Sequence, residues 1–164
     1  MVTVIYRPNA TGTYLEITNS SQYSRVNDQS DSTYIGQLYN FGRATYNFPN
    51  PSEKGTINSV TVWVKGRCAN ATYGDGMNPA FLVGSTLSES ANQYVYSTFV
   101  WKSYTRTTNP ATGLAWTWED LNSLQIGVRT VNSQGWGVWV SEIYVEIDYT
   151  PLQTAGPQLI GLTW

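Results

Sequence analysis

Residues 136–149, which read WGVWVSEIYVEIDY, decide the fold class of this chain. Apolar and polar side chains alternate along the stretch, with the two-residue period of a strand that has one buried face. The side chains expected to face a core are Trp139, Ile143, Val145, Ile147 and Tyr149, and those expected on the opposite face are Glu142, Tyr144, Glu146 and Asp148. The stretch therefore predicts one long, half-buried strand.

The same alternation recurs through the chain and predicts an all-β protein. In the strand expected over Thr56–Arg67, Val60, Val62 and Val64 point inward, whereas Thr61, Trp63 and Lys65 point outward. Further strands are expected at Thr3–Tyr6, Tyr14–Thr18, Tyr34–Phe41, Pro79–Val83, Tyr94–Tyr104 and Gln125–Val131, separated by turn-forming residues about every ten positions. About eight short strands in one domain favour a single antiparallel β-sandwich of jelly-roll type.

One short helix is expected near residues 117–123. Thr117 is a good N-cap, and Asp120, three residues on, completes a capping box. Turn formers at 108–113 precede this helix, so the strand that ends near Tyr104 is expected to cross there to the other sheet.

Composition excludes several classes of function. The net charge is −2, only 12% of the 164 residues are charged, and the nine cations form no cluster, so nucleic-acid binding is not expected. Neutral polarity comes from 20 Thr, 15 Ser and 13 Asn. No 18-residue apolar run and no secretory signal occurs, which predicts a soluble chain without a membrane segment.

Enzymatic chemistry is not expected. Histidine is absent, which removes the commonest general base and metal ligand, and Cys68 stands alone, so no intrachain disulfide can form. A glycosidase that uses Glu146 and Asp148, two residues apart on one strand face, is the alternative considered, but any alternating strand produces that spacing. No cofactor is expected. Calcium on the oxygen-rich run Asn27–Ser32 or on Gly74-Asp75-Gly76 remains an alternative to ordinary turn chemistry.

Aromatic side chains are the remaining candidates for a ligand site or an interface. The chain holds seven Trp, twelve Tyr and four Phe. Trp63 and Tyr144 lie on strand faces assigned away from the core, and Trp136 lies in a loop. Such rings can stack on sugars or form subunit contacts. The third alternative is that loops of the same chain cover them.

The last fifteen residues differ from the rest. Pro151 and Pro157 interrupt a strand ladder, and the end is apolar through Leu159, Ile160, Leu162 and Trp164. We therefore divide the chain into a β-sandwich domain at 1–149 and an extended C-terminal arm at 150–164. Because exposed apolar residues are costly in water, those four are expected to be assembly contacts.

Several segments resemble a family of jelly-roll-like structural proteins of tailed bacteriophages, of the head-decoration or tail-associated type. They are Tyr6–Tyr14, Asp28–Tyr34, Ile57–Val60, Thr107–Thr117 and Ile143–Tyr149, the most specific being TNPATGLAWT at 108–117. The resemblance covers about residues 6–149 and implies a component of the virion surface without catalytic residues.

The expected function is therefore that of a capsid decoration protein, made in the host cytoplasm and carried on the virion surface. It would bind the assembled shell, through the major capsid protein or another virion protein, and form a homo-oligomer such as a trimer. The alternative is a carbohydrate-binding or receptor-binding β-sandwich module of a phage tail, in which Trp63 or Trp136 stacks on a sugar. The apolar arm favours the first function, because a sugar binder does not need one.

Overall fold

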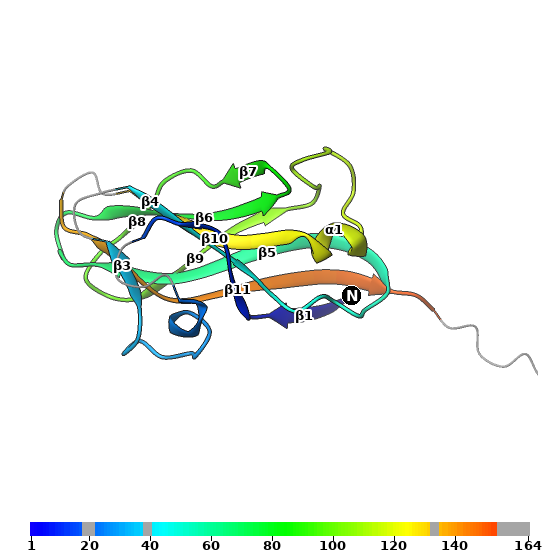
Figure 1. The fold of residues 1–164 in the computed structure, drawn as a ribbon, viewed down its shortest axis with the longest axis horizontal. Helices are drawn as coiled ribbons and strands as arrows, with labels where there is room; N and C mark the ends of the chain where they lie inside the picture. The colour runs from blue at the N-terminus through cyan, green and yellow to red at the C-terminus, as the bar shows by residue number, and fades with distance from the viewer. Residues whose placement is uncertain (18–21, 38–40, 132–134, 154–164) are drawn as a thin grey trace, which may run out of the picture.

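The structure, a computed structural model, describes residues 1–17, 22–37, 41–131 and 135–153. Within them the chain forms two antiparallel sheets packed face to face, with one short α-helix at one end (Figure 1). The expected all-β sandwich is confirmed. No helix in the described part of the chain is long and apolar enough to cross a bilayer.

Each sheet draws its strands from both halves of the chain. Sheet A has the order β1 (Val2–Tyr6), β11 (Val138–Pro151), β5 (Gly55–Cys68) and β9 (Val100–Arg106), with β3 (Ile35–Gln37) also paired to β11. Sheet B has the order β2 (Ala10–Leu15), β4 (Gly42–Asn47), β10 (Leu124–Val131), β6 (Asp75–Val83) and β7 (Thr86–Glu89), with β8 (Gln93–Val95) also paired to β6. A 3₁₀ turn, η1 (Tyr23–Arg25), and helix α1 (Trp118–Asn122) complete the fold.

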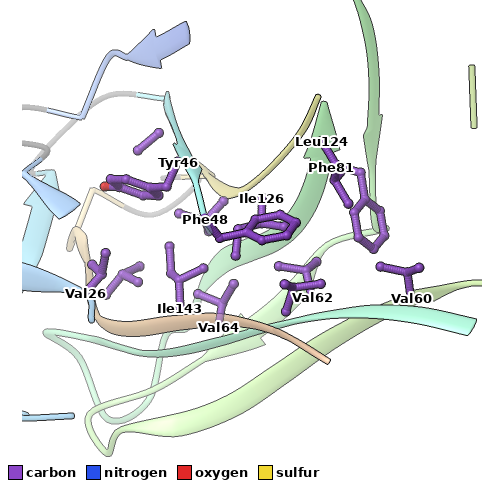
Figure 2. Packing of buried hydrophobic residues seen from close by; sticks show 14 of the residues in the cluster. Val26, Tyr46, Phe48, Val60, Val62, Val64, Phe81, Leu124, Ile126 and Ile143 are labelled. Atoms are coloured by element: carbon purple, nitrogen blue, oxygen red, sulfur yellow. The ribbon is translucent and has the colours of Figure 1, made fainter. Parts of the chain in front are cut away.

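The core lies between the two sheets. Figure 2 shows Val60, Val62 and Val64 of β5 and Ile143 of β11 pointing from sheet A toward sheet B. They meet apolar side chains of sheet B, among them Tyr46, Phe81, Leu124 and Ile126. The inward faces predicted for Val60, Val62 and Val64, and for Ile143, Val145 and Ile147, are confirmed, because all six side chains are buried.

The prediction for Trp139 is wrong. The pairing of β11 with β5 shifts register between Val140 and Glu142, which marks a β-bulge at Ser141. A bulge inserts one residue and reverses the alternation on one side of it. Val138 and Val140 therefore enter the core, and Trp139 lies half-buried on the outer face of sheet A.

Some strand boundaries also differ from expectation. The single strand predicted at Tyr94–Tyr104 is two strands in different sheets, β8 in sheet B and β9 in sheet A, so the chain crosses between layers at 96–99. The strand expected at Tyr14–Thr18 lies earlier, at Ala10–Leu15. Strands β4 and β7 were not predicted as separate elements, so eleven strands stand where about eight were expected within the described residues.

The short helix is confirmed together with its cap. The Thr117 hydroxyl accepts a hydrogen bond from the Asp120 backbone N–H at 3.2 Å, and the Asp120 carboxylate accepts one from the Thr117 N–H at 2.8 Å. The helix lies between β9 in sheet A and β10 in sheet B, at the expected crossover. At the boundary expected between the sandwich domain and the C-terminal arm, after Tyr149, strand β11 continues through Pro151, which pairs with Gly55.

Candidate functional site

A groove lies beside β3 and the start of β11, on the outer side of sheet A. Its volume is about 820 Å³, within the range of small-ligand sites. Its lining residues are Gln22, Ser24, Arg25, Ser32, Thr33, Tyr34, Gly36 and Trp139. In Figure 1 the segment 22–34, in blue, extends outward from sheet A near β3, away from α1.

The groove is built by a cross-strand row of three residues. Gly36 of β3, Trp139 of β11 and Arg67 of β5 stand opposite one another. A Cβ on Gly36 would lie 2.9 Å from Trp139 Nε1 and still closer to Cδ1, so the glycine leaves room for the indole ring to lie over β3. The Arg67 guanidinium lies 4.5 Å from the centroid of the Trp139 ring, a cation–π contact. Neighbouring strands therefore fix the position of the indole.

Tyr34 is the second ring of the groove and is 37% exposed. Its ring meets that of Trp139 edge to face, with the centroids 6.2 Å apart. Arg25, in the last turn of η1, donates a hydrogen bond at 3.4 Å to the Tyr34 carbonyl. The two rings and the Arg25 guanidinium thus line a cavity whose other polar side chains are hydroxyls and an amide.

The loop that carries Tyr34 is fastened to sheet A by Asp31. Its carboxylate lies 2.9 Å from Lys65 Nζ and accepts a hydrogen bond at 2.7 Å from the Ser141 hydroxyl. Lys65 also lies 3.2 Å from Glu142, which pairs with Arg7 at 3.5 Å. Desolvation opposes the shift, but the hydrogen bonds from Ser141 and Lys65 hold the pKa of the Asp31 carboxyl below its usual value. The bulged Ser141 thus contributes an anchor for the loop.

Trp63 and Tyr144, predicted as ligand or interface aromatics, come together on the outer face of sheet A. Their rings stack with centroids 6.1 Å apart, and Trp101 of β9 meets Tyr144 edge to face at 5.1 Å. The Arg7 guanidinium lies 5.3 Å from the centroid of the Tyr144 ring. Burial raises the pKa of the Tyr144 phenol. Trp63 and Tyr144 are half-buried, as Trp139 of the groove is, and Trp101 is 37% exposed.

Trp136 does not join that cluster. It lies in the turn before β11, and its side chain is 44% exposed. Its backbone N–H and that of Gly137 each donate to the Asp75 carboxylate at 3.2 Å. The predicted assembly contacts Leu159, Ile160, Leu162 and Trp164 lie outside the described residues.

The acidic candidates mostly have partners within the protein. Asp28 accepts hydrogen bonds from the Ser30 N–H at 3.1 Å and from the Thr33 hydroxyl. Asp75 is fully buried. Among the described residues no group of three or more His, Cys, Asp or Glu side chains is arranged to hold a metal ion. Glu146 and Asp148 share the outer face of β11, as expected.

Sequence reasoning missed the groove residues Tyr34, Trp139 and Arg25. The alternation predicts a strand that begins at Tyr34 and a core position for Trp139, because a period-two pattern does not reveal the bulge at Ser141. One signal was present, since Ser141 breaks the apolar series between Trp139 and Ile143. A polar residue in the core register of a long strand indicates a bulge as readily as a buried hydroxyl.

No family model matches the chain, and no curated protein matches it. Among solved structures, the chain is similar to a Clostridium thermocellum endo-1,4-β-D-xylanase containing a CBM22-1 and a GH10 module, complexed with xylohexaose. The TM-score is 0.52 at 9% identity, covering 94% of this chain and 30% of that one.

Two further structures match less well. The C-terminal CBM6 of a laminarinase from Zobellia galactanivorans has a TM-score of 0.46 at 11% identity, covering 89% of this chain and 98% of that one. The enzymatically active domain of bacteriophage CBA120 tailspike protein 4 has a TM-score of 0.44 at 13% identity, covering 89% and 19%. At these identities the likeness concerns the fold alone, which is a β-sandwich found in carbohydrate-binding modules.

Proposed function

We propose that this chain is a carbohydrate-binding β-sandwich module that holds a glycan in the groove between Tyr34 and Trp139. The observation that carries the proposal is the groove itself, in which two aromatic rings face a cavity whose remaining lining is hydroxyl, amide and guanidinium groups. A sugar ring presents C–H groups to an aromatic face and hydroxyls around its edge. The lining offers partners for both.

The proposal places the sugar at other residues than the sequence predicted, but the interaction is the same, a sugar ring stacked on an aromatic side chain. Trp63 and Tyr144 stack on each other, and Arg7 lies over the Tyr144 ring, whereas Tyr34 is 37% exposed. The chain is also similar in fold to a xylanase chain that contains a carbohydrate-binding module, and this similarity of fold supports the proposal.

The proposed activity is binding without catalysis. Trp139 and Glu146 are seven residues apart on β11, which places the carboxylate pair about 20 Å along the strand from the groove. A glycan seated on Tyr34 would therefore not lie with its reacting bond between Glu146 and Asp148.

The virion setting implied by the phage resemblance remains a prediction, and so do the trimer and the capsid partner. Glycan binding would suit a tail-associated receptor-binding module better than a head decoration protein, because receptor recognition requires a ligand groove. A chain ending at Gln153 keeps β11 whole. A lower mass of this chain than of the full chain in light scattering would assign assembly to residues 154–164.

The function is tested by calorimetric titration of the full chain with oligosaccharides from a panel of neutral and acidic polysaccharides. Tyr34→Ala should weaken binding of any ligand found by about ten-fold, the equivalent of about 1.4 kcal/mol. Tyr94→Ala is the matched control, because Tyr94 is 50% exposed but lies on β8 in sheet B. The proposal fails if no glycan binds at millimolar concentration, or if both variants lose affinity equally.

A further inference from the structure

The electrostatics of the groove indicate the class of sugar. Of its eight lining residues, Arg25 alone carries a charge. A second guanidinium, that of Arg67, lies on the Trp139 ring. One guanidinium therefore lines the groove and a second lies against its indole ring, in a protein whose net charge is −2. A binding site for neutral sugars needs no such excess of positive charge.

The nearby carboxylates are already engaged elsewhere. Asp31 is paired with Lys65 and hydrogen-bonded to Ser141, and Asp28 accepts hydrogen bonds within its own loop. Glu142 is held by Lys65 and Arg7. Asp31 and Glu142 are thus paired with other cations, and none of these three acids forms an ion pair with Arg25 or Arg67.

In the described part of the chain, Arg25 and Arg67 share with Arg106 the lack of an ion pair, whereas the other three arginines each have one. Arg7, Arg43 and Arg129 each form an ion pair with a glutamate. Within the described residues, neither Arg25 nor Arg67 has an acidic side chain within ion-pair distance. A guanidinium that has no carboxylate partner within the protein can form an ion pair with a carboxylate of a ligand.

The geometry at Arg25 suits that role. Nη1 donates a hydrogen bond to the Tyr34 backbone carbonyl, which ties the guanidinium to the backbone of the residue that carries the groove's tyrosine ring. A guanidinium has five N–H donors, so four remain, and its planar fork matches a carboxylate in a bidentate hydrogen-bonded pair. A sugar ring against Tyr34 would bring a carboxylate on that ring within reach of the same arginine.

We propose that the groove selects a carbohydrate that bears carboxylates, a uronate-containing chain, with Tyr34 against the sugar ring and Arg25 pairing with the carboxylate. This inference rests on the proposed function and names its ligand class. Arg67 acts as a positioning residue, because it holds the Trp139 indole and adds positive charge at the groove.

The test is calorimetric titration of the full chain with a uronate oligosaccharide, a neutral oligosaccharide of the same length and linkage, and a sulfated one. We expect the uronate to bind at least ten-fold more tightly than the neutral sugar, consistent with a charge-assisted bidentate pair. Arg25→Gln should remove most of that preference, because it should weaken binding of the uronate by a larger factor than binding of the neutral sugar. Lys54→Gln is the matched control, since it removes the same charge from an exposed position beside β5 at Gly55, far from the groove.

The outcomes distinguish a failure of the uronate inference from a failure of the proposed carbohydrate binding. Equal binding of neutral and uronate sugars, weakened by Tyr34→Ala, overturns the uronate inference and leaves the carbohydrate module standing. Tighter binding of the sulfated chain than of the uronate overturns the carboxylate assignment. Equal losses in Arg25→Gln and Lys54→Gln would mean that overall charge, rather than Arg25, sets the preference. No binding of any of the three, nor of any other glycan of the panel, removes both proposals.

Discussion

Replacing Gly36 by alanine should disturb the groove by displacing Trp139. An alanine Cβ would lie 2.9 Å from the indole Nε1 and closer still to Cδ1, whereas unstrained carbon contacts need about 3.5–4.0 Å. The ring must therefore move by about 1 Å. Overpacking of this kind costs about 1–3 kcal/mol, and the alanine regains about 0.5–1 kcal/mol because it stiffens the unfolded chain. The expected net loss of unfolding free energy is about 1–2 kcal/mol.

A double-mutant cycle isolates the contact. In a Trp139→Ala background the obstacle is gone, so Gly36→Ala should become neutral or stabilise by up to about 1 kcal/mol. Urea denaturation of the four proteins measures the coupling, and near-UV circular dichroism reports the displaced indole. Gly84→Ala is the control, because its φ of +59° strains the backbone while nothing lies within 4 Å of the new Cβ. The same loss for Gly36→Ala in both backgrounds would refute the assigned role of the Trp139 ring.

Three further variants test the core, the cap and the loop anchor. Phe81→Ala removes a buried ring that meets two other aromatic rings, and it should lower the unfolding free energy by about 3–5 kcal/mol in urea denaturation. Thr117→Ala deletes the helix cap and should cost about 1 kcal/mol, read as a shift of about 2–4 °C in the melting temperature; an unchanged melting temperature would contradict the cap's contribution. The pKa of the Asp31 carboxyl is lower in the folded protein than in the unfolded chain, where it is about 3.9. Asp31 therefore contributes to the unfolding free energy above about pH 3.9, and this contribution is lost as the pH falls through the folded pKa. The stability of Asp31→Asn should thus lie below that of the parent at pH 7, by under about 1 kcal/mol because the pair with Lys65 is partly exposed, and the two should converge below about pH 4.

The sequence was most informative where burial alone sets the pattern. Val60, Val62 and Val64 alternate with polar neighbours, and each is buried. The Thr117 cap was predictable because a capping box uses only residues three apart. Local periodicity and local hydrogen bonds need no knowledge of distant chain segments.

The boundary errors have a common cause. Strands β8 and β9 read as one run because neither contains a strong turn signal, yet they pair with β6 and β5 in different sheets. Which sheet a strand joins depends on partners far away in the chain. A pattern along the chain carries no record of those partners.

The residue types and their alternation determined the all-β class, the faces of the long strands and the presence of half-buried aromatics on the outside of a sheet. Only the tertiary structure decided which aromatics line the groove. The bulge at Ser141 moves Trp139 outward, and pairing with β3 brings Gly36 beneath it and Tyr34 beside it. The groove depends on contacts between segments about a hundred residues apart. Those contacts arise because folding buries one face of each sheet, whereas the periodicity of a single strand records only which of its own faces is buried.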